Sequence, residues 1–218
     1  MRAVRFIAPV LLAVQLPFHQ SVSGVWIDLV AFNSVAIAAL ISVLVAPRIN
    51  NKWAQPLTAL AIGAWSLGSI AATMSTYLGD SVFIGNLSEP LYLLFYPLAL
   101  LGVQLLISIQ QRLTVLEVVD ASIVGLGLST LGTAFALHPV LPHFDGNFKQ
   151  SFLAVIYPVA DLVLLCFIAA TVVMQGFSVR GFLLSLGVLI YATTDFVFLW
   201  QNINSSYVFG SLIDYGWL

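Results

Sequence analysis

The segment Phe152–Met174 reads FLAVIYPVADLVLLCFIAATVVM and carries a single charged residue, Asp161. A helix needs about 20 apolar residues, at ~1.5 Å of rise each, to cross the hydrocarbon core of a bilayer. This run is long enough, and it lacks the alternating polarity that is typical of membrane strands. The segment therefore predicts a transmembrane helix.

Six further runs of this kind lie along the chain, separated by short polar connectors. They are Ala3–Phe18, Trp26–Ala46, Pro56–Tyr77, Glu89–Ile109, Val115–Leu137 and Phe182–Trp200. The last segment, 201–218, begins polar and ends in Ile213-Asp-Tyr-Gly-Trp-Leu218, which is typical of the first turn of an eighth, incomplete span. The prediction is an all-α fold: a polytopic transmembrane helical bundle of seven spans plus the start of an eighth, in one membrane-embedded domain over residues 1–218.

The composition supports an integral protein of the cell membrane whose surroundings are the lipid bilayer. Hydrophobic residues make up 61% of the 218 residues, charged residues make up 7%, and the mean hydropathy is +1.04. Soluble domains contain about 25% charged residues. A net charge of −2 without a basic stripe argues against a nucleic-acid partner, and a single cysteine, Cys166, excludes an internal disulfide.

Lys and Arg residues predict the orientation, because cytoplasmic connectors are enriched in them. All but Lys149 fall on one side of the predicted bundle, which places the N-terminus in the cytoplasm: Arg2, Arg5, Arg48, Lys52, Arg112 and Arg180. Residues 1–23 also fit a signal peptide, with a basic start, an apolar centre and small residues near its end. Both interpretations of residues 1–23 leave the remaining topology unchanged.

An internal repeat relates the later spans. Tyr96-Pro97 recurs as Tyr157-Pro158 in similar apolar surroundings, and the start of the fourth span resembles residues 212–218. The spans therefore read as repeated helical hairpins. Proline inside a helix removes a hydrogen bond and kinks the axis, so Pro97 and Pro158 are either matched hinges around a cavity or features of helix packing.

Ionisable residues inside a span are costly and mark functional candidates. Asp161 and Asp195 lie in the outer halves of their spans, in a layer with other polar side chains. We expect this layer to line a cavity open to the outside, with ligand- or proton-site candidates Asp161, Asp195, Tyr96, Tyr157, Asn33 and Thr194. The alternative is that each aspartate hydrogen-bonds a neighbouring helix. Four further acids lie near predicted helix starts, where the helix dipole favours negative charge: Asp28, Glu89, Asp120 and Asp214.

Catalytic chemistry is not predicted. No histidine lies beside a nucleophile in a span, no lysine lies inside a span, and no glycine-rich phosphate loop is present. His138, His143 and Asp145 share a connector that reads as a solvated loop rather than a metal site. The sequence therefore predicts neither an enzyme nor a bound cofactor or metal.

Several motifs follow one another in order: SEPLYLLFYPLALLG (88–102), VDASIV (119–124), AVIYPVADLVLL (154–165), Thr194-Asp195 and LIDYGWL (212–218). Together they resemble the N-terminal multi-span module found ahead of GGDEF and EAL domains in bacterial, especially actinobacterial, cyclic-di-GMP signalling proteins. This resemblance implies that the following residues occupy recurrent positions: Asp120, Asp161, Asp195, Tyr96-Pro97 and Tyr157-Pro158. Such modules often carry Gly-Asp in the third span, where this chain has Gly68-Ser69.

The resemblance implies a sensory module that regulates a cytoplasmic GGDEF- or EAL-type output domain, whose signatures this chain lacks. The partner would be that output domain or a second copy in a homodimer. Two other classes stay open. One is a small transporter or channel subunit that uses the intramembrane aspartates as proton or cation sites. The other is a structural subunit of a membrane complex.

Overall fold

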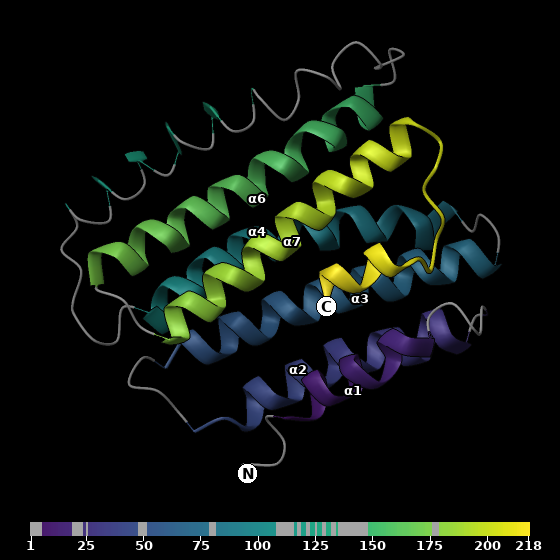
Figure 1. The fold of residues 1–218 in the computed structure, drawn as a ribbon, viewed down its shortest axis with the longest axis horizontal. Helices are drawn as coiled ribbons and strands as arrows, with labels where there is room; N and C mark the ends of the chain where they lie inside the picture. Colours follow the sequence, from purple (N-terminus) through teal and green to yellow (C-terminus); the bar gives the residue numbers. More distant parts are fainter. Residues whose placement is uncertain are drawn as a thin grey trace. The chain divides into compact units, whose positions relative to one another are not determined.

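A computed structural model describes residues 6–18, 24, 26–47, 52–78, 82–107, 148–175 and 179–218, with isolated residues between 116 and 134. Every regular element in the described part of the chain is helical (Figure 1). The α-helices are α1 (Ile7–Gln15), α2 (Phe32–Val45), α3 (Ala54–Leu78), α4 (Val82–Ile107), α6 (Phe148–Gln175) and α7 (Val179–Ile203). Two short 3-10 helices, η2 (Leu16–Phe18) and η5 (Leu212–Trp217), and a π-helix, η3 (Trp26–Ala31), complete the set.

Five helical stretches are long and apolar enough to cross a membrane. They are Trp26–Val45, Ala54–Leu78, Asn86–Leu106, Phe152–Ala170 and Gly181–Asn202. The all-α prediction and the membrane character of the chain are thus confirmed, and five of the seven predicted spans are found.

The first, fifth and eighth predicted spans are not confirmed. Helix α1 has nine residues, about 14 Å, and gives way at Leu16 to η2, which contains Pro17, a residue without the N–H that continues a helical hydrogen-bond ladder. Most of the predicted fifth span, Val115–Leu137, lies outside the described residues. Residues 212–217 form a 3-10 helix rather than an α-helical turn.

Several helices begin earlier than the apolar runs that predicted them. Helix α4 begins at Val82, so the prediction that Glu89 opens a helix, with Pro90 in its first turn, is wrong. Both residues lie inside α4. In the same way Lys149 and Arg180 lie in the first turns of α6 and α7 rather than in connectors. Hydropathy predicts the part of a helix that lies in lipid, whereas the helix itself can continue into the flanking polar residues.

The chain falls into two compact units. The first contains Met1–Leu106 with Gly210–Gly216 and Leu218, and the second contains Ile107–Phe209 with Trp217. In the first unit α1 packs beside α2, and α2 packs on α3 (Figure 1). Small side chains dominate the buried face of α3, including Ala61, Ala64 and Ala71. Small residues let membrane helices approach closely.

Two glycines set close contacts between α3 and α4. A Cβ added to Gly102 would lie 2.8 Å from the Thr58 Oγ1 atom and 2.9 Å from the Thr58 backbone nitrogen. A Cβ added to Gly68 would lie 2.9 Å from the ring of Tyr92. A side chain at Gly102 therefore forces these helices to move apart, whereas one at Gly68 first displaces the Tyr92 ring.

Side-chain amides bridge neighbouring helices of the first unit. The Gln55 Nε2 atom, in the first turn of α3, donates to the carbonyl oxygens of Val43 (2.7 Å), Leu44 (2.8 Å) and Ala46 (3.2 Å). These carbonyls lie at the C-terminal end of α2, where helical donors run out, although the Val43 carbonyl also accepts the Ala46 backbone N–H at 3.2 Å. Gln15 of α1 donates to the Ala31 carbonyl at 2.8 Å, at the point where η3 changes into α2.

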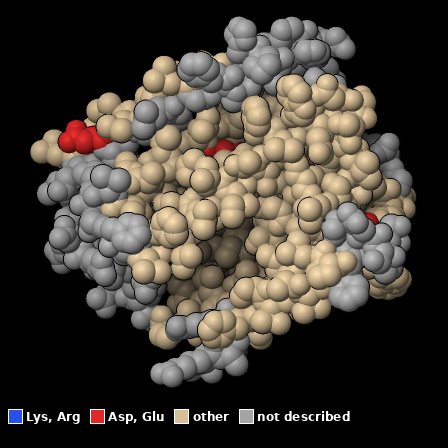
Figure 2. Space-filling view, viewed as in Figure 1, with Lys and Arg blue, Asp and Glu red and all other residues tan. Residues whose placement is uncertain are grey.

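The second unit is built on the hairpin of α6 and α7, which run side by side (Figure 1). Its buried apolar side chains include Leu164, Phe167, Ile168 and Leu199. The exposed side of α7 is apolar, with Phe182, Leu183, Leu186, Leu189, Ile190 and Trp200. Figure 2 shows a face of the molecule on which the described side chains are almost all uncharged. Such surfaces suit contact with lipid.

Candidate functional site

The hairpin of α6 and α7 brings the two intramembrane aspartates to one level. Asp161 lies 14 residues before the end of α6 at Gln175, and Asp195 lies 16 residues after the start of α7 at Val179. At ~1.5 Å per residue, these positions are ~21 Å and ~24 Å from the connected ends of the helices. The short connection makes the helices antiparallel, so both carboxylates lie in the same layer of the second unit.

Asp161 is the most deeply buried acid among the described residues, at 1% exposure. It shares the buried side of α6 with Pro158, Leu164 and Ile168, at spacings of three or four residues. A carboxyl group in such surroundings pays a large desolvation cost when it is charged. The position of Asp161 is therefore chemically unusual, and its role as a ligand or proton site stays a prediction.

Asp195 is hydrogen-bonded by the C-terminal segment. The Trp217 Nε1 atom donates to the Asp195 Oδ1 atom at 2.5 Å. The Trp217 ring also packs edge-on against Phe198, with ring centroids 5.4 Å apart, and Phe198 packs against Tyr207 at 4.7 Å. Asp195 thus accepts a hydrogen bond from η5, which lies outside the five candidate spans.

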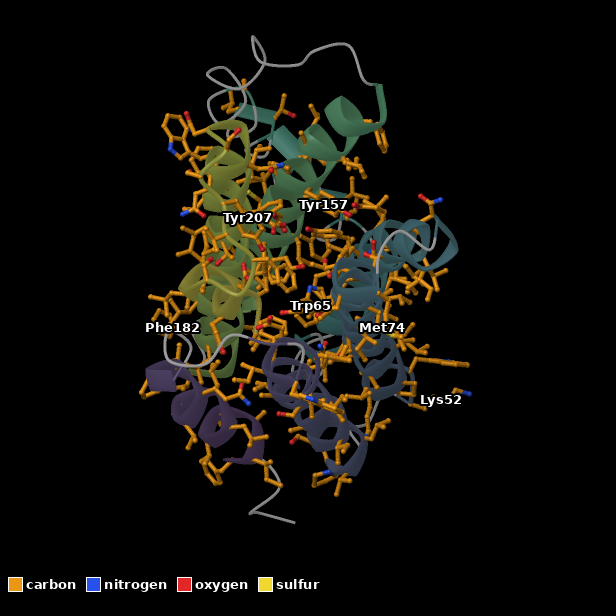
Figure 3. The ribbon with its side chains drawn as sticks, turned by 90° about the vertical axis from the view of Figure 1, so that its right-hand side faces the viewer. Lys52, Trp65, Met74, Tyr157, Phe182 and Tyr207 are labelled. Carbon is orange, nitrogen blue, oxygen red and sulfur yellow. The ribbon has the colours of Figure 1, made fainter. Side chains whose placement is uncertain are left out.

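The remaining candidates of the second unit are Thr194, Tyr157 and Pro158. The buried Thr194 hydroxyl donates to the Ile190 carbonyl at 2.9 Å, within its own helix. Pro158 is buried inside α6, and the adjacent Tyr157, labelled in Figure 3, is half-buried. The hydrogen bond from Thr194 to Ile190 satisfies the threonine hydroxyl within its own helix, without a ligand.

The candidates of the first unit are Asn33, Tyr96 and Pro97. Asn33 is 1% exposed, and its Nδ2 atom donates to the Leu29 carbonyl at 2.9 Å and to the Asp28 carbonyl at 3.4 Å. Asn33 therefore supports the irregular backbone of η3. Tyr96 is buried, whereas Pro97 is exposed. The matched prolines Pro97 and Pro158 thus differ in burial.

A cluster that no sequence pattern indicated forms around Asp28. The Tyr77 hydroxyl, at the end of α3, donates to the Asp28 Oδ2 atom. Gly210 of the C-terminal segment lies near the Oδ1 atom of this carboxylate and donates its backbone N–H to Asp214, and both carboxylates act electrostatically on Tyr215. We call Asp28, Tyr77, Gly210, Asp214 and Tyr215 the Asp28 cluster. Asp28 lies in the first turn of η3 and Asp214 in the first turn of η5, as predicted. No sequence pattern indicates that two residues so far apart in the chain belong to one cluster.

Burial raises the pKa of the Tyr215 hydroxyl above its ordinary value of 10.0, and the negative charges of Asp28 and Asp214 raise it further. Tyr215 packs edge-on against Phe32, with ring centroids 5.7 Å apart, and Phe32 packs against Trp65 at 6.2 Å. The phenol therefore stays protonated, as a hydrogen-bond donor, throughout the neutral range.

No family model, curated protein or solved structure matches this chain. Among the residues that the structure describes, no group of three or more His, Cys, Asp or Glu side chains is placed to hold a metal ion. The chemistry of the described sites is that of carboxylates held by phenol and indole donors. Such groups can exchange protons, bind cations or fix a segment in place.

Proposed function

We propose that the chain is a membrane-embedded sensory module that regulates a cytoplasmic output domain of the GGDEF or EAL type. The order of motifs from Ser88 to Leu218 supports this assignment. In this mechanism an outside or lipid-borne signal shifts the helices between two packings, and the C-terminal segment carries the shift onward. Catalysis belongs to the output domain, not to this chain.

The observation that carries the proposal is the hydrogen bond from Trp217 to Asp195. It joins an ionisable group of a spanning helix to the segment that, in such modules, leads toward the output. A change in protonation or packing at Asp195 then alters how firmly this segment is held. A residue with a merely structural role would need no ionisable acceptor at this point.

A transporter or channel subunit is the second candidate, and the burial of Asp161 favours it. A shielded carboxyl in a spanning helix can carry a proton or hold a cation during transport. In this case Asp161, rather than Asp195, is the residue on which activity depends.

The test begins with the reading frame downstream of Leu218. A GGDEF or EAL domain encoded there supports the sensor, and the whole protein is then assayed in membranes for cyclic-di-GMP turnover. We expect Trp217→Phe and Asp195→Leu to change this turnover equally, and the double variant to change it no further. Each of the three variants removes the same hydrogen bond, from Trp217 to Asp195. Trp200→Phe, on the exposed side of α7, is the matched control and leaves turnover unchanged.

Flux measurements separate the two candidates. Proton or cation flux in liposomes that is lost in Asp161→Asn supports the transporter and contradicts the sensor. Turnover of cyclic-di-GMP that responds equally to Trp200→Phe and Trp217→Phe also contradicts the proposed role of the Trp217 hydrogen bond.

A further inference from the structure

A cation and an indole ring lie together at the exposed start of α3. Lys52 and Trp53 come directly before the helix, which begins at Ala54. The Lys52 Nζ atom lies 5.7 Å from the centroid of the Trp53 ring, and the Trp53 side chain is 60% exposed. Lys52 extends away from the helices in Figure 3. Tryptophan and lysine are typical of the level at which a membrane helix meets the lipid headgroups. This pair therefore marks the headgroup level of α3.

A narrow line of exposed apolar side chains continues from Trp53 along α3. Leu60 and Leu67 follow at intervals of seven residues, close to two helical turns, and are 59% and 57% exposed. Ala54 and Ala61, the next residues in the chain after Trp53 and Leu60, are buried. Other sides of α3 contact α2 and α4. Lipid therefore reaches the middle of this helix mainly along one line.

Gly63 leaves open space within this line. It lies three residues after Leu60 and four before Leu67, a spacing that keeps the three positions on one face of the helix. A Cβ added to Gly63 would meet no atom within 4 Å. The ten residues from Trp53 to Gly63 rise by ~15 Å, which is half of the ~30 Å hydrocarbon core. An acyl chain that starts at the level of Trp53 therefore ends beside Gly63.

The charge at the start of α3 favours an anionic headgroup. No acidic residue occurs between Asp28 and Asp80 in the sequence, so no acid in this stretch of the chain offsets Lys52. A lysine near the membrane surface attracts anionic lipids, and its flexible stem lets the ammonium group reach the headgroups. A zwitterionic headgroup carries its own cation beside the phosphate and is attracted less.

We propose that Lys52, Trp53, Leu60, Gly63 and Leu67, which we call the α3 line, hold an anionic phospholipid. The Lys52 ammonium group binds the headgroup phosphate, and the Trp53 ring lies where the headgroup meets the acyl chains. One acyl chain then follows Leu60 and fills the space beside Gly63. This inference concerns a lipid site of the first unit and does not depend on the proposed sensory function.

Photocrosslinking of the full chain in nanodiscs tests the site. The nanodiscs contain phosphatidylcholine and a trace of phosphatidylglycerol that carries a diazirine near the end of one acyl chain. After irradiation, mass spectrometry maps the adducts. We expect adducts on residues 60–67 to be about fivefold more frequent than with a phosphatidylcholine probe of the same acyl chains, the preference that one lysine near an anionic headgroup supplies. Leu87 and Leu94, on the exposed side of α4, report unselective lipid contact and should not favour phosphatidylglycerol.

Variants at Lys52 separate charge from general lipid contact. Lys52→Gln removes the cation and should make adducts on residues 60–67 equally frequent with the two probes. Lys52→Arg keeps the charge and should keep the preference. Lys149→Gln, which removes a cation from the first turn of α6, is the matched control and leaves the preference unchanged.

A preference on residues 60–67 that Lys52→Gln abolishes and Lys149→Gln retains supports the lipid site. Equal adduct frequencies with the two probes in the wild type overturn the proposal. It is also overturned by a preference that survives Lys52→Gln, or by one that is equally strong at Leu87 and Leu94.

Discussion

Tyr215 shows how one residue depends on both its packing and its charged neighbours. Its ring is buried against Phe32, and its hydroxyl lies within the influence of Asp28 and Asp214. The sequence indicated only the first turn of an incomplete eighth span at this point. Its partners come from residues far away in the chain, so no local pattern could have predicted them.

The raised pKa of Tyr215 makes a pH-dependent prediction. Because the pKa in the folded state lies above that in the unfolded chain, the stabilisation by Tyr215 is complete below the unfolded value of about 10. It is lost as the pH rises through the folded-state pKa. We therefore expect Tyr215→Phe to lose less stability than the wild type above pH ~10, measured by thermal unfolding in detergent. Equal alkaline losses in the two proteins would contradict this prediction.

At the scale of elements, Gln55 joins the end of α2 to the start of α3. We expect Gln55→Met, which keeps the length of the side chain, to lower the free energy of unfolding by about 1–3 kcal/mol, because helix-end carbonyls lose their donor. Gln104→Met is the control for the loss of an amide, because the Gln104 side chain on α4 is also half-buried. Denaturant titration of the two variants measures the difference. If Gln55→Met lowers the free energy of unfolding no more than Gln104→Met does, the proposed role of Gln55 at the end of α2 is contradicted.

The contact between α3 and α4 gives a second prediction at this scale. We expect Gly102→Ala to cost about 1–3 kcal/mol, because the new methyl group meets the Thr58 backbone, which cannot rotate away. Gly63→Ala, in open space on the same pair of helices, is neutral or gains about 0.5–1 kcal/mol from better helix propensity. Equal stability of the two variants in a thermal shift assay would contradict the close contact of Gly102 with Thr58.

At the scale of the whole molecule, hydropathy predicted an all-helical membrane protein because each spanning helix must present an apolar surface to lipid. It located five spans but misplaced the start of α4, because the extension before Glu89 is a matter of backbone hydrogen bonding rather than of hydropathy. Asp161 and Asn33 are each buried at 1% exposure, and the polar layer expected around them stays a prediction. The sequence could not have predicted the donor to Asp195, since Trp217 reaches it only through the fold of the C-terminal segment.

Orientation is the prediction that concerns the whole chain. Lys52, which extends away from the helices in Figure 3 and lies 5.7 Å from the Trp53 ring centroid, is expected in the cytoplasm together with Arg180. In a Cys166→Ser background, single cysteines at positions 52 and 180 should react with a membrane-impermeant reagent only from the cytoplasmic side. A cysteine at position 149 should react only from outside. Labelling of positions 52 and 180 from opposite sides would contradict the predicted topology.

The sequence distance between partners sets the order in which contacts become available during synthesis. The Gln55 amide and the carbonyls of α2 are 9 to 12 residues apart, so they can meet as soon as the first turn of α3 has left the ribosome. Asp28 can meet Tyr77 only 49 residues later, and Gly210 only when almost all of the 218 residues have been made. Until then, the Asp28 carboxylate is in the membrane region without its contact to Gly210.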